Sequence, residues 1–210
     1  MKSDILIVGG AGHIGLPLGL LLANKGKKVV LYDKDKKNLN KINNLEMPFF
    51  EIDGKKLLKK NFNKIIVTSN KNYIKNSKII IICIGTPVKD GKPDLKFFFK
   101  MFKEIKNYLT PDKLIIIRSS IYPGTCSNVQ KYLGKNYKNI SYCPERVVQG
   151  RSIVELPKLP QIISGLSNKS IKDSKKLFKL ICKKIIITSI LEAELIKLFS
   201  NAWQYINFSI

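Results

Sequence analysis

The sequence has few histidine, arginine and tryptophan residues and no long apolar segment. With one histidine (His13) and four cysteines lacking a CxxC spacing, it offers no zinc motif, and we expect the cysteines to be reduced structural thiols. The longest apolar run, residues 79–84, is far shorter than the roughly 20 residues of a membrane-spanning helix. The first residues superficially mimic a signal peptide, but Asp4, several glycines and Pro17 interrupt them. We therefore expect a cytoplasmic protein with no membrane partner.

The charge is strongly of one sign, because 38 Lys and Arg residues outnumber 15 Asp and Glu and give a formal net charge of +23. A nucleic-acid interface usually gathers its charge on one face or arm, with arginine and aromatic residues interleaved. Here 35 of the basic residues are lysines, spread evenly over both halves of a chain rich in isoleucine and asparagine. This composition is typical of an A- and T-rich genome and argues against a specific nucleic-acid partner. A basic surface can still attract anionic ligands such as phosphates.

Apolar runs of strand length alternate with segments of helix length over most of the chain. We expect strands at 4–9, 28–33, 64–68, 78–84, 113–118, 139–143, 161–164 and 185–188, and helices at 13–25, from about 35, and at 51–60, 94–109, 124–133 and 170–182. Nearly continuous apolar strands suit a parallel sheet that is buried on both faces. The alternation predicts an α/β fold with a Rossmann-like, doubly wound and mostly parallel sheet over residues 1–188.

The last segment differs, because a helical pattern runs from Leu191 to Ile210 without a stop signal. We expect residues 189–210 to begin an α-helical central domain. The large apolar side chains of this segment need a cover, either from a partner subunit or from a further part of a longer protein. We favour the second.

The strongest local motif is the glycine pattern at residues 10–15, Gly-Ala-Gly-His-Ile-Gly. It follows a predicted strand, opens a predicted helix, and precedes an acidic residue at the end of the next strand, as a dinucleotide-binding fingerprint requires. The first glycine allows a tight turn, the second lets the backbone approach a pyrophosphate, and the third lets the helix pack on the strand. An aspartate accepts hydrogen bonds from the adenosine ribose and repels a 2′-phosphate, which favours NAD over NADP, although neighbouring lysines weaken this argument. The expected cofactor-binding residues here are Gly10, Gly12, His13, Ile14, Gly15 and Asp33.

Six motifs stand in order along nearly all 210 residues: Gly-His-Ile-Gly-Leu-Pro at 12–17, Asn…Pro…Glu…Leu-Leu at 44–58, Ile-Gly-Thr-Pro at 84–87 followed by Pro-Asp-Leu at 93–95, Arg-Ser-Ser-Ile-Tyr-Pro-Gly-Thr at 118–125, Cys-Pro-Glu-Arg at 143–146, and Ala-Glu-Leu-Ile-Lys…Asn at 193–201. Together they resemble the UDP-glucose/GDP-mannose dehydrogenase family, the nucleotide-sugar 6-dehydrogenases. Six motifs in register are far more specific than any one of them.

The resemblance implies a four-electron oxidation of a sugar C6 alcohol to a carboxylate with two NAD⁺. Lys197 and Asn201 stand four apart on one helix, so they share a face and can converge on the C6 oxygen as charge develops there. Glu145 matches the carboxylate that activates water against a thioester intermediate. Without the resemblance, we would interpret Lys197 and Asn201 as solvated helix residues and Glu145 as the partner of Arg146 in a loop salt bridge.

Three further residues take expected roles from the resemblance. Ser120 stands where the family usually has threonine, and its hydroxyl can hold a catalytic water or the cofactor amide. Thr86 is expected to contact the cofactor. Arg146 is expected to contact the substrate, together with Glu145, Lys197 and Asn201.

The resemblance also places the nucleophilic cysteine in a motif beyond residue 210, and none of the four cysteines falls in that motif. We therefore expect this chain to bind NAD without completing the oxidation by itself. The expected substrate is a UDP-sugar of the UDP-N-acetylmannosamine or UDP-glucose type, and the Cys-Pro-Glu-Arg form favours the N-acetylhexosamine branch. The expected assembly is a homodimer through the helix at residues 191–210.

Two alternatives remain open at this point. The chain could be a non-catalytic NAD-binding remnant or a regulatory partner, or a nucleic-acid binder driven by its charge, which the even lysine distribution disfavours. A hydroxyacid dehydrogenase on the same cofactor fold would not explain the segments at 118–125 and 143–146.

Overall fold

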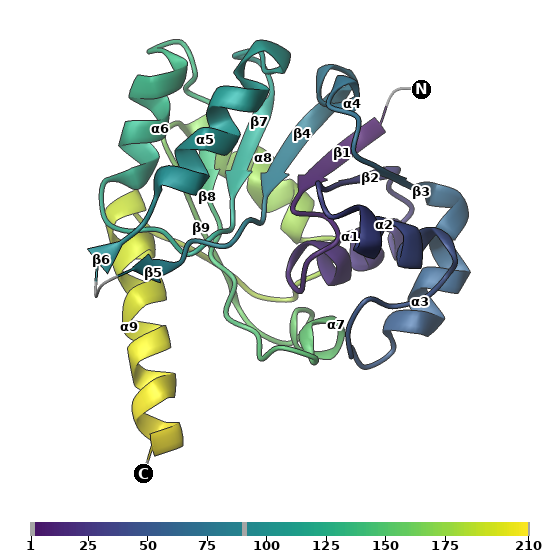
Figure 1. Cartoon of the computed structure of the whole chain (residues 1–210). Helices are drawn as coiled ribbons and strands as arrows, with labels where there is room; N and C mark the ends of the chain where they lie inside the picture. The colour runs from purple at the N-terminus through teal and green to yellow at the C-terminus, as the bar shows by residue number, and fades with distance from the viewer. Residues whose placement is uncertain (1–2, 90–91, 210) are drawn as a thin grey trace.

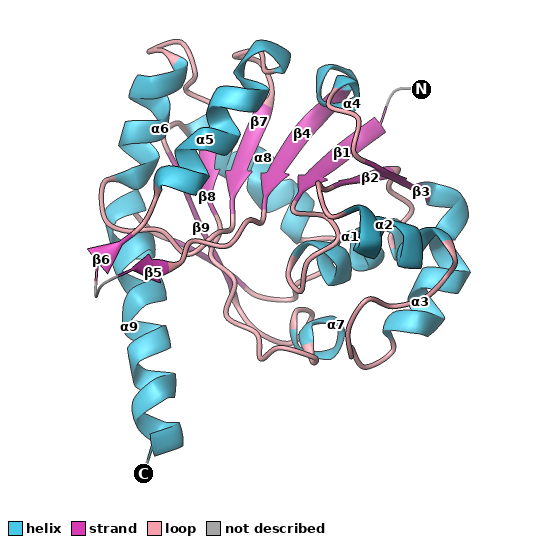
Figure 2. Ribbon diagram, in the orientation of Figure 1, coloured by secondary structure: helices cyan, strands magenta, loops and turns pink. Residues whose placement is uncertain are grey.

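The computed structural model describes residues 3–89 and 92–209, which form a sheet with helices on both faces (Figures 1 and 2). The strands of the main sheet are β1 (Ser3–Val8), β2 (Val29–Tyr32), β3 (Ile65–Thr68), β4 (Ser77–Ile82), β7 (Leu114–Ile117), β8 (Ile140–Tyr142), β9 (Gln161–Gly165) and β10 (Ile185–Ile187). A short antiparallel pair, β5 (Val88–Lys89) and β6 (Lys92–Pro93), lies outside it. The helices are α1 (Gly15–Asn24), α2 (Lys36–Asn43), α3 (Gly54–Asn61), α4 (Asn72–Asn76), α5 (Lys96–Ile105), α6 (Thr125–Leu133), α7 (Ser152–Glu155), α8 (Asn168–Phe178) and α9 (Ile190–Ser209), with 3₁₀ turns η1 (Phe62–Lys64) and η2 (Lys106–Tyr108).

The sheet has the strand order β10-β9-β8-β7-β4-β1-β2-β3. All neighbours pair in parallel except β8 and β9, which are antiparallel. From β3 to β8 this is the order of a dinucleotide-binding fold, in which the strand order reverses between β1 and β4 and ligands bind beyond the carboxyl ends of the strands. The predicted Rossmann-like, doubly wound, mostly parallel sheet is confirmed.

Side chains of the central strands alternate between two apolar cores, because successive residues of a strand point to opposite faces. Ile5 and Ile7 of β1 pack in a core with side chains of α1, α3 and α8. Leu6 and Val8 pack in the opposite core with side chains of α5, α6 and the first turn of α9. The near-continuous apolar strands of the sequence are thus explained by burial on both faces.

Most expected elements are present, and the differences have local causes. Helix α1 begins at Gly15 rather than residue 13, because the preceding residues form the glycine turn. Helix α3 begins at Gly54 rather than residue 51, after Asp53 adopts the left-handed conformation with φ 60°. The elements α4, α7 and the β5–β6 hairpin were not predicted, since they are too short to show a period.

The expected domain boundary at residues 188/189 stays a prediction. Helix α9 projects away from the sheet (Figure 1), and its first turn is buried at Ala193. Further along, large apolar side chains of α9 such as Phe199 and Trp203 are exposed, and Ile210 lies outside the described residues. Over the part of the chain that the structure describes, no helix is long and apolar enough to cross a bilayer.

The turn from β1 to α1 brings backbone against backbone. Gly9 has φ +78°, and a Cβ there would lie 2.3 Å from the Cys83 carbonyl oxygen. A Cβ on Gly15 would lie 2.2 Å from the Gly9 carbonyl oxygen, whereas one on Gly10 would meet Leu31 of β2. The left-handed residue of this turn is therefore Gly9 and not Gly10, which was predicted to allow the tight turn; Gly10 is instead needed for close packing on β2.

Replacing Gly9 with alanine should destabilise the chain more than the same change at Gly26. Both glycines have positive φ, but a Cβ at Gly26 would meet nothing within 4 Å. We expect Gly26→Ala to cost about 1 kcal/mol from backbone strain alone. Gly9→Ala should cost roughly 2 kcal/mol more, because it adds a clash with the backbone of Cys83. Urea unfolding of both variants measures the difference, and equal losses would contradict the close approach.

Candidate active site

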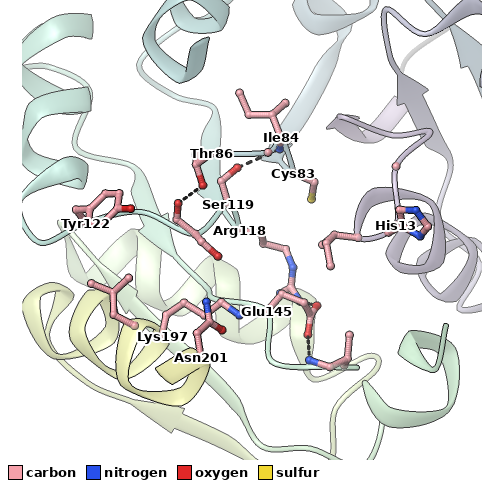
Figure 3. A pocket seen from close by; sticks show the side chains of 16 residues that line it. His13, Cys83, Ile84, Thr86, Arg118, Ser119, Tyr122, Glu145, Lys197 and Asn201 are labelled. Carbon is pink, nitrogen blue, oxygen red and sulfur yellow. Dashed lines mark hydrogen bonds and ion pairs between the residues drawn. The ribbon is translucent and has the colours of Figure 1, made fainter. Parts of the chain in front are cut away.

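A cavity of about 620 Å³ lies beyond the carboxyl ends of β1, β4, β7 and β8 and against α9 (Figure 3). It brings together eight of the residues expected from the sequence: Gly12, His13, Ile14, Thr86, Ser120, Glu145, Lys197 and Asn201. His13 and Lys197 lie on opposite sides, with Arg118 and Glu145 between them (Figure 3). Segments nearly 190 residues apart in sequence therefore line the same cavity.

Four expected site residues are outside this cavity wall. Gly10 and Gly15 are packed inside the glycine turn. Asp33 borders a smaller, adjoining cavity of about 100 Å³ beside Gly9. Arg146 donates from its guanidinium to the carbonyl oxygen of Pro160, and its expected contact with substrate stays a prediction.

The Asp33 carboxylate is fixed by backbone amides. Oδ2 accepts from the Ala11 amide at 3.0 Å, and Oδ1 accepts from Lys34 at 2.7 Å and Asp35 at 3.1 Å. Lys34 in turn pairs with Glu104 of α5 at 2.5 Å, and this partner lowers the pKa of Glu104. Lys34, one of the neighbouring lysines that weakened the argument for NAD, is therefore paired with Glu104.

Glu145 is held by a residue that the sequence reasoning did not assign to the site. Its Oε2 forms an ion pair with the Arg118 guanidinium, while its Oε1 accepts from the amides of Arg146 at 2.7 Å and Val147 at 3.2 Å. The loop salt bridge considered from the sequence, Glu145 with Arg146, is thus replaced by a pair across two strand ends. The carboxylate is nearly buried yet forms part of the cavity wall.

Arg118 is one of the most deeply buried residues, with 2% of its surface exposed. Its Nη1 donates to Gln161 Oε1 at 3.0 Å, and its guanidinium lies 5.0 Å from the ring centre of Phe178. Its Nε has no hydrogen-bond partner among the residues that the structure describes. The sequence did contain a signal: an arginine, rare in this chain, directly after a strand that is apolar throughout. Only the fold shows that it reaches Glu145.

Lys197 is half-buried on α9, and its amine belongs to the cavity wall. Burial, followed by the positive charges of Arg118 and Arg146, lowers the pKa of Lys197 to about 8. Asn201, one turn further along α9, is more exposed and faces the same space. The amine can therefore change its protonation state near neutral pH, which a solvated lysine does not do.

The loops after β4 and β7 are joined across the cavity. Thr86 donates from Oγ1 to the carbonyl oxygen of Ser120, and the Ile84 amide donates to Ser119 Oγ at 3.0 Å. These contacts hold Thr86 and the Ser120 hydroxyl in the same wall. Both are therefore placed where a cofactor bound over the strand ends would pass.

His13 connects the glycine turn to two other loops. Its ring stacks on Phe49 with centres 3.9 Å apart, and its Nδ1 lies 2.9 Å from Gln149 Nε2. Burial lowers the pKa of His13, so the ring is neutral at neutral pH. The Gln149 loop is also fixed by Glu51, which is buried and accepts from the Ile153 amide at 2.9 Å. His13 is thus held between Phe49 and the Gln149 loop at the edge of the cavity.

All four cysteines are free thiols. Cys83 touches the cavity, and burial raises its pKa to about 12. Burial also raises the pKa of Cys143 to about 12 and the pKa values of Cys126 and Cys182. None is an activated thiolate, which agrees with the expected structural role.

The fold and this cavity define a dinucleotide-binding domain of an oxidoreductase. Residues 3–182 match the NAD binding domain of the UDP-glucose/GDP-mannose dehydrogenase family, and the chain belongs to this family. Its cofactor is NAD, as the fingerprint and Asp33 predicted.

Relatives of known name are nucleotide-sugar dehydrogenases. The chain is 31% identical to a UDP-N-acetyl-D-mannosamine dehydrogenase of Pyrococcus horikoshii, over 96% of this chain and 50% of the relative, and 28% identical to a UDP-glucose 6-dehydrogenase of Rickettsia felis, over 92% and 46%. The structure of the Pyrococcus horikoshii enzyme superposes with a TM-score of 0.89 at 30% identity, covering 96% of this chain and 50% of that one. A GDP-mannose dehydrogenase of Pseudomonas aeruginosa, with a TM-score of 0.88 at 22% identity over 98% and 50%, shares the fold. The chain spans about half the length of these relatives.

Replacing Glu145 with glutamine should destabilise the chain far more than replacing Glu155. Glu145→Gln leaves the buried guanidinium of Arg118 without a counter-charge, which should cost roughly 3 kcal/mol. Glu155 pairs with Arg151 at the surface, so Glu155→Gln should cost less than about 1 kcal/mol. Urea unfolding at pH 7 measures both, and similar small losses would show that the Arg118–Glu145 pair does not organise the cavity.

Proposed function

We propose that this chain forms the NAD-binding and C6-facing part of a UDP-sugar 6-dehydrogenase, of the UDP-N-acetylmannosamine or UDP-glucose type, that oxidises the sugar C6 alcohol to a carboxylate. The observation that carries the proposal is the cavity itself, which has the glycine turn on one side and the low-pKa lysine of α9 on the other. The names of the relatives support the substrate class.

The glycine turn fits a dinucleotide. A Cβ on Gly12 would have only the Gly9 carbonyl oxygen near it, at 3.4 Å, and Gly12 belongs to the cavity wall. Its exposed backbone face lets a pyrophosphate approach the start of α1, where unpaired amides favour anions. Asp33, at the neighbouring smaller cavity, is placed to bind the adenosine ribose. Thr86, in the wall of the larger cavity, is placed to contact the cofactor.

Lys197 and Asn201 suit the oxygen of the reacting carbon. When bound, NAD⁺ would supply the hydride acceptor for sugar C6, and loss of the alcohol proton would place negative charge on the C6 oxygen. The Lys197 amine, with a pKa of about 8, can stabilise that charge when protonated and accept the alcohol proton when neutral. The Asn201 amide, one turn away, can donate to the same oxygen.

Glu145 suits the activation of water in the later, hydrolytic half of the reaction. Arg118 and two amides hold its carboxylate in one orientation, and Oε2, which pairs with Arg118, keeps further acceptor capacity for a water in the cavity. The Ser120 hydroxyl, in the same wall, can hold that water or the cofactor amide.

The chain by itself binds NAD but does not complete the oxidation. A thiolate has to trap the aldehyde, and burial holds the thiols of this chain in their protonated form. This same observation favours the second candidate function, a non-catalytic NAD-binding remnant or regulatory partner. The exposed Phe199 and Trp203 of α9 support assembly through this helix, as a homodimer.

Calorimetric titration of the purified chain tests the cofactor assignment. We expect saturable binding of NAD⁺, weaker binding of NADP⁺ because Asp33 repels the 2′-phosphate, and no oxidation of UDP-sugars. Gly12→Val fills the open face of the turn and should weaken NAD⁺ at least tenfold, about 1.4 kcal/mol, at an unchanged melting temperature. A folded chain that does not bind NAD⁺ would overturn the proposal.

Alkylation by iodoacetamide tests the thiols. A rise in pKa from 9.0 to about 12 for Cys83 and Cys143 leaves about 1000-fold less thiolate at pH 7.5. Both should therefore react about 1000-fold more slowly in the folded chain than in urea, as followed by mass spectrometry of their peptides. A cysteine that reacts as fast in the folded chain would contradict the claim that no thiol is activated.

A further inference from the structure

Glu194 of α9 is a carboxylate with none of its surface exposed. Its Oε2 accepts from the Gly124 amide at 2.7 Å, and its Oε1 accepts from the Cys126 amide at 3.0 Å. Both oxygens are thus paired with the start of α6, seventy residues earlier in the chain. Glu194 belongs to the motif at 193–201, in which the expected site residues are Lys197 and Asn201.

These two contacts cap α6. The first amides of a helix lack partners within the helix, and a negative charge is favourable at that end. The N-cap residue of α6 is Gly124, which has no side chain to supply the cap. Glu194 supplies it from another helix, so α6 and α9 are joined by two charge-assisted hydrogen bonds, of which the one from Gly124 is partly buried and the one from Cys126 is buried.

The clamp lies between two parts of the cavity wall. Gly124 ends the loop that carries Ser120 and Tyr122, and Lys197 follows Glu194 by three residues on α9. At that spacing, Glu and Lys on a helix surface commonly form an ion pair. Here the carboxylate is directed to α6 instead, and the amine of Lys197 projects into the cavity (Figure 3).

Glu194 is not among the charged groups that shift the pKa of Lys197. Lys197 is influenced by Arg118 and Arg146, and Glu145 belongs to the same cavity wall. The Glu194 charge acts on the other side, where after burial it helps to raise the pKa values of Cys126 and Tyr142.

We propose that Glu194 is a positioning residue: by capping α6 it fixes helix α9 against the Ser120 loop and keeps the Lys197 amine unpaired inside the cavity. The role of Lys197 in this inference rests on the proposed function. The geometry that Glu194 imposes on Lys197 can be tested without cofactor or substrate.

The test is competitive acetylation of the lysines with trace acetic anhydride at pH 6 to 11, followed by mass spectrometry. The other lysines serve as internal standards. In the wild type, reactivity of Lys197 should rise with a midpoint near 8. The substitution Glu194→Gln places a side-chain amide group against the backbone amides of α6. We expect this to release the cap and to let water reach Lys197. The midpoint should then move up by at least about one pH unit, toward that of a solvated lysine.

Glu192→Gln is the matched control. Glu192 lies on the same helix, is exposed, and accepts from the Ser189 amide at 2.9 Å rather than from α6. It removes the same charge, so its Lys197 midpoint should stay at the wild-type value. A folded Glu194→Gln chain with the wild-type midpoint, or an equal shift in both variants, would overturn the positioning role.

A measurement on the unaltered chain covers the case in which Glu194→Gln fails to fold. Hydrogen exchange should show the amides of Gly124 and Cys126 protected at least about 100-fold relative to unstructured peptide, and unprotected amides would overturn the clamp. Failure of NAD⁺ binding would leave these readings intact, so the proposed function and the positioning role can fail separately.

Discussion

A guanidinium without access to water is the constraint around which this site is arranged. Removing such a charge from solvent costs several kcal/mol, so Arg118 has to be neutralised where it lies. Glu145 provides the counter-charge from the loop after β8, and Gln161 accepts from the start of β9. Three strand ends are thereby fixed to one another. The same positive charge helps to lower the pKa of Lys197, so one buried interaction links the stability of the fold to the chemistry of the cavity.

The cavity has two sides of different construction. On the cofactor side, backbone contacts at Gly9 and Gly15 are so close that no side chain fits, and among the glycines of this turn Gly12 leaves an open face. On the opposite side, buried charges do the positioning: Arg118 holds Glu145, and Glu194 holds α9. The sheet order brings the two sides together, because β1 lies next to β4 and β4 next to β7. The proposed reaction, with a hydride acceptor on one side and a proton-transferring amine on the other, requires such rigid spacing.

The sequence was sufficient for the fold class, since isoleucine-rich strands and a glycine fingerprint depend on local patterns. It was also sufficient to name Lys197 and Asn201 as neighbours on a helix. It could not identify the partner of Glu145, because Arg118 is 27 residues away and adjacency in sequence favoured Arg146. It placed the tight turn at Gly10 rather than Gly9, since a glycine pattern does not specify φ. Burial of polar groups, as at Glu194, depends on tertiary contacts, which a local sequence pattern does not reveal.

We propose that one cavity, at the carboxyl ends of the strands, receives NAD⁺ within reach of Lys197. A backbone amide NMR titration with NAD⁺ tests this directly. We expect shifts at Gly12, Ile14 and Thr86, extending to Ser120 and Lys197. A second cleft of about 520 Å³ at the amino ends of the strands, lined by Lys27 and Asn139 among others, provides the internal comparison. Shifts confined to that cleft, or changes that reach Gly12 but never Lys197, would contradict the account.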